Sequence, residues 1–189
     1  MTEKTNKKNN PCGAPPLATA FLAGSYCPAC AGLDEGRLLE NWHPAYFLIY
    51  SFIRRCMGRD YAAFGGDCLL AMVVGEIWLY NMGRYLRRNG ADGISRKLAD
   101  PDTRLSDLPA CNAYSISESL GIPRETVRRK VKKLIDMGWV ERRESGDLTV
   151  TAVCEQEFQA NFVAETVRDF VSTARHALDL VERQFGISG

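Results

Sequence analysis

The sequence predicts a mainly α-helical protein that carries one small β-hairpin, and three observations indicate this fold class. Apolar residues recur at helical spacing in several long segments, most clearly over 163–185. Two short strand-like runs, 139–143 and 148–151, flank the turn-forming residues 144–147. A short helix, a glycine turn and a basic helix come directly before that hairpin. Helix, turn, basic helix and hairpin in this order predict a winged helix-turn-helix domain.

The 189 residues divide by composition into four predicted parts. Residues 1–32 are polar or small and predict a flexible segment, and 33–64 predict an N-terminal helical region. The winged helix-turn-helix domain is expected over 65–153, with its core at 113–153. A long C-terminal helix is expected over 154–189.

The N-terminal region predicts two helices. The first begins near residues 41–43 and is apolar on almost every side, which is typical of a helix buried in a core or against a partner subunit. The second begins after Asp67 as its N-cap and ends near Arg88. It is expected to be the first helix of the winged domain or a helix directly beneath it. Glu76 lies on its apolar side and needs a polar partner, either Arg84 or a tyrosine hydroxyl, and a structural role is favoured over ligand binding.

The connection to the winged core is expected to be irregular. Residues 87–102 contain Gly90, Gly93 and Pro101 and predict a loop, and 105–113 have room for one helical turn. The short helix that follows is expected to start with a capping box formed by Ser115 and Glu118.

The basic helix is expected over 124–137, after the turn at Gly121 and before a left-handed cap at Gly138. Its apolar positions fall on one face, which we expect to be buried: Val127, Val131, Leu134 and Ile135. Between 121 and 145, eight basic and four acidic residues leave a charge of +4, whereas six acidic and three basic residues leave −3 over 155–186. A basic helix beside an acidic one favours attraction of phosphate to the basic helix.

These features predict a DNA-binding surface. Its candidate residues come from the two helices and the hairpin: Ser115, Arg124, Glu125, Thr126, Arg128, Arg129, Lys132, Lys133, Arg142 and Arg143. Arg124 and Arg129 suit the guanine edge in the major groove, and Glu125 suits the amino group of cytosine. Phosphate contacts are assigned to the remaining basic residues and Thr126.

The start of the basic helix, Arg124-Glu125-Thr126-Val127-Arg128-Arg129, is similar to the recognition helix of the cyclic-AMP receptor protein family. The longer stretch SESLGIPRETVRRKVKKLIDMGWVER resembles bacterial winged-helix regulators of the GntR, IclR and MarR type. The resemblance covers about 113–153. It implies base contacts by Arg124, Glu125 and Arg129. No cyclic-nucleotide-binding β-roll is apparent before residue 100, so the resemblance implies no nucleotide effector.

Other functions remain open at this point. A basic helix is often merely a solvated face, and winged helices also serve as protein-interaction modules. A metal- or thiol-responsive regulator is a further alternative, because Cys27 and Cys30 have the spacing of half a tetrahedral metal site. Cys12 and His43 are the weak candidates for the other two ligands, and ordinary cysteines are favoured over a metal site.

The sequence favours neither an enzyme nor a membrane protein. It has two histidines, no glycine-rich phosphate loop and no signature of a catalytic nucleophile, and no cofactor is expected. Seven cysteines without a paired framework and no apparent signal peptide predict a cytoplasmic protein. No apolar run is long enough to predict a transmembrane helix. Nothing identifies a small-molecule effector.

The C-terminal helix carries apolar residues at heptad spacing, which we call the C-terminal seam: Val163, Val167, Phe170, Ala174, Leu178, Val181 and Phe185. Two interpretations remain. The seam packs on the N-terminal helices of its own chain, or it pairs with a second copy. A homodimer would suit a domain that binds palindromic double-stranded DNA.

Overall fold

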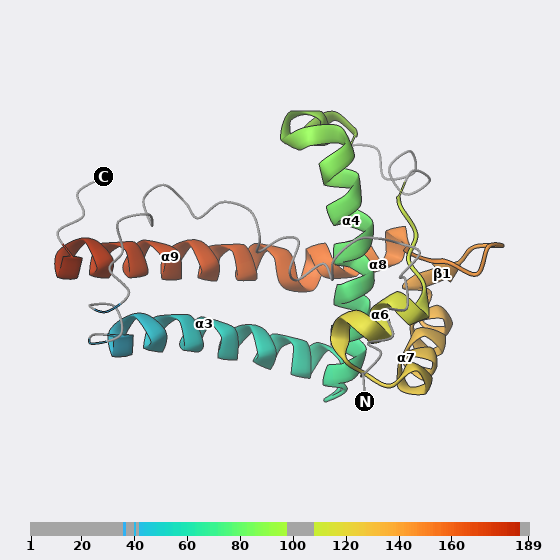
Figure 1. Cartoon of the computed structure of the whole chain (residues 1–189), viewed down its shortest axis with the longest axis horizontal. Coiled ribbons are helices and arrows are strands. Elements are labelled where there is room, and N and C mark those ends of the chain that lie inside the picture. The colour runs from blue at the N-terminus through green and yellow to red at the C-terminus, as the bar shows by residue number, and fades with distance from the viewer. Residues whose placement is uncertain (1–35, 37–39, 41, 98–107, 186–189) are drawn as a thin grey trace, which may run out of the picture.

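The computed structural model describes residues 36, 40, 42–97 and 108–185, and their side chains except those of 84–97, 181, 184 and 185. Figure 1 shows two long helices lying side by side and a compact domain at one end of them. The elements are, in order, α3 (Trp42–Ala63), α4 (Cys68–Lys97), α6 (Ala113–Leu120), α7 (Arg124–Asp136), β1 (Val140–Arg142), β2 (Leu148–Val150), α8 (Ala152–Phe158), η2 (Gln159–Val163) and α9 (Ala164–Phe185). This architecture confirms the predicted fold class.

The winged domain is built around the first half of α4, which packs against α6, α7 and β2. Leu70, Val73, Val74 and Ile77 are almost completely buried there. Their spacing of three, one and three residues puts them on one helical face, so burial of that face holds the domain together. α4 therefore packs as a helix of the winged domain, which is the first of the two placements that the sequence left open.

The hairpin pairs Val140 with Val150 and Arg142 with Leu148 in antiparallel register. Cys111 forms an isolated bridge with Leu148 from the other side. The helical turn expected within 105–113 is therefore wrong for residues 108–112, where the chain is extended until Asn112. Backbone hydrogen bonding to β2 outweighs the weak local preference for a turn.

The sequence analysis predicted both the N-cap and the last residue of α4, and only the N-cap is confirmed. Asp67 caps its N-terminus, since Asp67 Oδ1 accepts a hydrogen bond from the backbone N–H of Leu70 at 3.1 Å. The predicted end near Arg88 is wrong, because the helix continues to Lys97. Good helix formers close to the two glycines, among them Arg87, Arg88 and Ala91, outweigh the cost of Gly90 and Gly93.

Glu76 has a different partner from the two that were expected. The hydroxyl of Ser119 in α6 donates a hydrogen bond to Glu76 Oε1 at 2.6 Å. The carboxylate of α4 thus joins two helices of the winged domain, which agrees with the expected structural role.

α3 and α9 lie antiparallel and form a two-helix arm that projects from the winged domain (Figure 1). Asp169 joins them, because it accepts hydrogen bonds from Arg55 Nε at 2.9 Å and Arg59 Nη1 at 3.0 Å. These hydrogen bonds lower the pKa of the Asp169 carboxyl below its usual value, and the bond from Arg55 has the largest effect. No residue of α3 is buried, so the expectation of a helix enclosed on all sides does not hold within one chain.

The C-terminal helical segment begins earlier than the C-terminal seam indicated. Thr151 caps α8 by accepting a hydrogen bond from the backbone N–H of Cys154 at 3.2 Å. α8 then continues through the π-turn η2 into α9. No single helix of the described chain is long and apolar enough to cross a membrane; α3 and Cys68–Gly83 meet that test only as a pair, with a bend of 105° between them.

Candidate nucleic-acid interface

The short helix α6 begins at Ala113, two residues before the predicted capping residue. Its N-cap is Asn112, whose Oδ1 accepts a hydrogen bond from the backbone N–H of Ser115 at 2.9 Å. The expected capping box of Ser115 and Glu118 is therefore wrong. Asparagine is as good an N-cap as serine, and the bridge at Cys111 places Asn112 at the turning point. Gly121 ends α6 with a φ of 65°, as the turn requires.

The basic helix α7 presents two distinct faces. Val127, Val131 and Leu134 are buried against α4 and α6, and Ile135 is partly buried. The opposite face carries the predicted arginines and lysines. Burial of the apolar face therefore fixes which side chains of α7 point outward.

An ion-pair cluster sets the position of α7 on α4. Lys130 Nζ lies 2.6 Å from Asp67 Oδ1 and Lys133 Nζ lies 3.3 Å from Asp67 Oδ2. The hydrogen bond from Lys130 is the main reason why the pKa of the Asp67 carboxyl lies below its usual value. Asp67 thus caps α4 and holds α7 at once. The sequence analysis found the cap but not the lysine contacts, since nothing in the local pattern connects residues 63 positions apart.

Arg124, the first residue of α7, stacks on an aromatic ring of α6. The Arg124 guanidinium carbon lies 4.0 Å from the centre of the Tyr114 ring, and Tyr114 itself is exposed. This stacking limits the orientations that the guanidinium adopts and leaves its edge exposed. Glu125 lies 3.6 Å from Arg128, but both are strongly exposed, so this pair contributes little to stability. The sequence analysis did not include Tyr114 among the DNA-binding residues. An aromatic residue at the start of the short helix before the basic helix could have indicated this contact with an arginine.

The hairpin supplies two more arginines in different settings. Arg142 is exposed, and its Nη1 donates to the carbonyl oxygen of Gly146 at 3.1 Å within the turn. Arg143 is partly buried, and its Nη2 donates to the carbonyl oxygen of Leu108 at 3.0 Å. The guanidinium of Arg143 therefore supports the extended segment next to β2, whereas that of Arg142 faces solvent.

The predicted DNA-binding residues thus lie along α6, α7 and the hairpin, on elements that are adjacent in Figure 1. Exposed side chains belong to Arg124, Glu125, Arg128, Arg129, Lys132, Lys133 and Arg142, whereas Ser115, Thr126 and Arg143 are partly buried. Arg129 and Lys132 make no hydrogen bond or ion pair with the described residues. Their charges are thus fully available to a partner of opposite charge.

The predicted metal candidates Cys12, Cys27 and Cys30 lie outside the described residues. Within the part of the chain that the structure describes, no group of three metal-ligating side chains occurs. His43 stacks on Trp42, with ring centres 4.1 Å apart. Burial raises the pKa of the Cys111 and Cys154 thiols to about 12, so both are poor nucleophiles.

The matching family model agrees with this geometry. A family described as the sugar-specific transcriptional regulator TrmB matches residues 104–157, which contain α6, α7, β1, β2 and most of α8. No curated protein and no solved structure matches the chain. The fold and the match together support a class: the winged helix-turn-helix transcriptional regulators, which are DNA-binding proteins. The match covers neither the arm nor any part of α4.

Proposed function

We propose that the protein binds double-stranded DNA sequence-specifically, as a homodimer on a palindromic operator in the cytoplasm. The observation that carries the proposal is the outward face of α7, where Arg129 and Lys132 are exposed and make no hydrogen bond or ion pair with the described residues. Buried apolar residues hold the opposite face of the helix. Cationic side chains on a fixed helix match the requirements of a helix that enters the major groove.

Base recognition is assigned to the first turns of α7. Arg124 and Arg129 donate to guanine, and Glu125 accepts from the cytosine amino group. The ring of Tyr114 supports this assignment, because it holds the Arg124 guanidinium in place before DNA arrives. A preorganised side chain loses less conformational freedom on binding.

Phosphate contacts are assigned to residues around this centre. They are Ser115 at the start of α6, Thr126, Arg128, Lys132 and Lys133 on α7, and Arg142 and Arg143 on the hairpin. We expect Arg142 to contribute more than Arg143, because only Arg143 is engaged by a backbone carbonyl of the extended segment. Such contacts fix orientation on the duplex without reading its sequence.

The exposure of the C-terminal seam supports the homodimer. Val167, Phe170 and Leu178 have exposed fractions of 54%, 58% and 54%. α9 contacts α3 mainly through a neighbouring stripe that includes Asp169 and Thr173. The Phe170 ring also packs on Phe52 of α3, with ring centres 5.8 Å apart. Val163, Val167, Phe170 and Leu178 are nevertheless exposed, and an exposed apolar row of this kind marks an interface.

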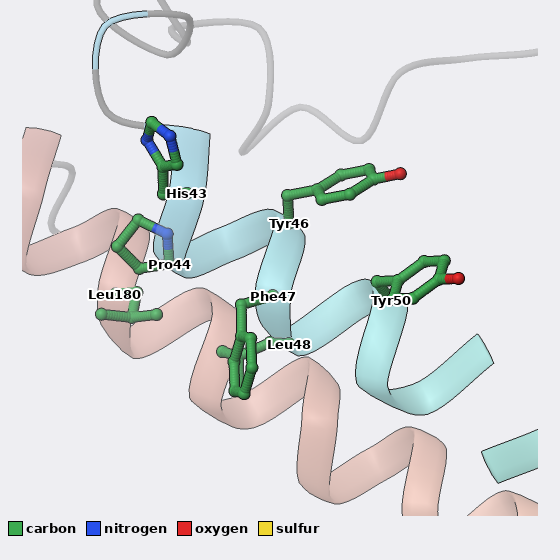
Figure 2. Close-up of a pocket in the computed structure, with 7 residues that line it drawn as sticks. All are labelled: His43, Pro44, Tyr46, Phe47, Leu48, Tyr50 and Leu180. Atoms are coloured by element: carbon green, nitrogen blue, oxygen red, sulfur yellow. The ribbon is translucent and has the colours of Figure 1, made fainter. Parts of the chain in front are cut away.

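α3 adds a second apolar row to the arm, formed by Trp42, Tyr46, Tyr50, Ile53, Met57 and Tyr61, all of them exposed. Figure 2 shows the Tyr46 and Tyr50 side chains projecting to the same side, away from the α9 segment that carries Leu180. Their rings are stacked, with centres 6.0 Å apart. Two arms that associate through such rows would make a four-helix arrangement, and heptad spacing suits helices that pack in this way.

Salt-dependent binding to duplex DNA tests the proposal. The affinity for a site selected from a random pool should fall steeply and linearly on logarithmic axes as salt rises, because bound phosphates release their counterions. The same protein should prefer the selected site over scrambled DNA at each salt concentration. Binding without any preference, or no binding, would reject sequence-specific recognition and favour a protein-interaction module.

A further inference from the structure

A cavity of about 770 Å³ lies where the arm meets the winged domain. Its walls come from the second half of α3, the middle of α4, and the segment that runs from α8 through η2 into α9. Trp78 of α4 and Phe158 and Phe162 of the C-terminal segment supply aromatic surface, and Val167 extends the apolar wall. The volume falls within the range of about 300–1,000 Å³ that is typical of sites for small organic molecules.

Arg59 lines the cavity but is already neutralised. Its Nη1 lies 3.0 Å from Asp169 Oδ2 and 3.6 Å from Glu165 Oε1, and its Nη2 donates to Cys56 Sγ at 3.3 Å. Its Nε is buried and has no hydrogen-bond partner among the described residues. A buried atom is out of reach of a ligand in the cavity. Arg59 therefore supplies no free positive charge for an anion.

Asp60, in contrast, contributes a carboxylate that the neighbouring Arg59 guanidinium offsets only through space. No described residue donates a hydrogen bond to this side chain or forms a salt bridge with it, although it lines the cavity. Partial burial raises the pKa of the Asp60 carboxyl, which is the expected cost of holding a carboxylate away from water. Glu155 of α8 adds a second carboxylate to the lining. Because Arg59 is held by Asp169 and Glu165, the Asp60 carboxylate remains able to face a cation in the cavity.

We propose that this cavity binds an amphipathic organic cation, with its apolar or aromatic body against Trp78, Phe158 and Phe162 and its positive charge towards Asp60. Aromatic faces attract cations in addition to the carboxylate, so both parts of the lining favour the same ligand class. The site is independent of the DNA-binding face, since none of the residues assigned to DNA lines the cavity.

Gly75 of α4 offers a way to fill the cavity without disturbing its walls. It lies in the lining, and a Cβ added there would meet no atom within 4 Å apart from its own chain neighbours and helix backbone. Gly75→Leu therefore places a side chain in the cavity, while Gly75→Ala leaves most of the volume open. Both changes replace a glycine within a helix, so neither should lower the stability of the fold.

Calorimetric titration of the full chain with tetraphenylphosphonium tests the proposal, and tetraphenylborate serves as the anion of matching shape. We expect saturable binding of the cation and none of the anion at the same concentrations. Asp60→Asn should weaken cation binding roughly tenfold or more, since it removes the charge and keeps the shape. Asp136→Asn, a change of the same kind at an exposed position on α7, should leave binding unchanged.

The glycine variants locate the binding site. Gly75→Leu should abolish cation binding while the thermal midpoint stays at or above that of the wild type, and Gly75→Ala should retain binding. The proposal is overturned if the cation does not bind saturably, if the anion binds equally well, or if Asp60→Asn has no effect. Undiminished binding in a folded Gly75→Leu variant overturns it as well.

Discussion

The side chain of Asn81 in α4 accepts a hydrogen bond from the backbone N–H of Val150 in β2, with Oδ1 and N separated by 3.0 Å. Nδ2 of the same amide donates hydrogen bonds to two backbone carbonyl oxygens, that of Pro109 at 2.6 Å and that of Leu148 at 3.4 Å. Asn81 is completely buried. One polar side chain thus connects the central helix to β2 and to the extended segment beside it.

Asn81→Leu should destabilise the winged domain by about 3 kcal/mol, because it leaves a buried N–H and buried carbonyls without partners. Chemical denaturation measures the change. Asn161→Leu is the matched control, since Asn161 is exposed and, among the described residues, its amide bonds only to Glu157 one turn away. Equal losses in the two variants would contradict the role assigned to Asn81.

Asp67 variants separate helix capping from the ion pairs with α7. Asp67→Ala should cost about 2 kcal/mol because it removes both, whereas Asp67→Asn keeps a good cap and should cost less. The pKa of Asp67 is below its usual 3.8 in the folded protein. Its ionised form therefore contributes stability above about pH 4, and this contribution disappears as the pH falls through the folded pKa. The stability difference between wild type and Asp67→Asn should shrink over that interval. A difference that is constant down to pH 2 would argue against the ion pairs.

Substitutions on α7 should separate base contacts from phosphate contacts. Arg124→Ala should cost about 1–3 kcal/mol on the preferred site and relax selectivity at one base pair. Lys132→Ala should weaken binding to all duplexes alike and reduce the salt slope by about one. Binding to a panel of single-base variants at several salt concentrations measures both effects. If Arg124→Ala also weakens all duplexes equally, its assignment to a base is wrong.

Leu178→Glu tests the dimer proposed through the arm. A carboxylate at this exposed position costs a single chain little, but in a dimer it would lie in an apolar interface, so we expect dissociation into monomers. Sedimentation with full and half operators measures both assembly and its effect on DNA binding. Ser172→Glu, an exposed position of α9 outside the C-terminal seam, should leave assembly unchanged. A dimeric Leu178→Glu variant would move the interface to the row on α3, and a wild type that is monomeric on DNA would exclude the dimer.

Cys27 and Cys30 are expected not to form a required metal site, since no further ligands occur at a recognisable spacing. Elemental analysis of protein purified without chelators should find well below one equivalent of zinc or iron per chain. About one equivalent that is lost in the Cys27→Ser/Cys30→Ser variant would establish a metal site instead.

The sequence by itself determined the winged domain well. The apolar spacing of Val127, Val131 and Leu134 and the turn glycines depend on neighbours within a few residues, and the structure has these elements as predicted. The outward basic face of α7 followed from the same pattern, because a helix buries one face and exposes the other. The N-cap of α6 did not follow from the local sequence, because both Asn112 and Ser115 are suitable N-cap residues. The β-bridge of Cys111 with Leu148 places Asn112 at the helix start.

Tertiary structure decided the contacts between distant parts of the chain. Asp67 with Lys130, Asn81 with Val150, and Asp169 with Arg59 join residues separated by 63 to 110 positions, and local periodicity contains no information about such pairs. The same reason applies to the cavity beside Asp60 and to the C-terminal seam. Heptad spacing indicated an apolar stripe on α9, but only the packing of α3 showed that Val163, Val167 and Leu178 stay exposed within one chain. Which surface remains free depends on where every other element lies, and that is a property of the assembled fold.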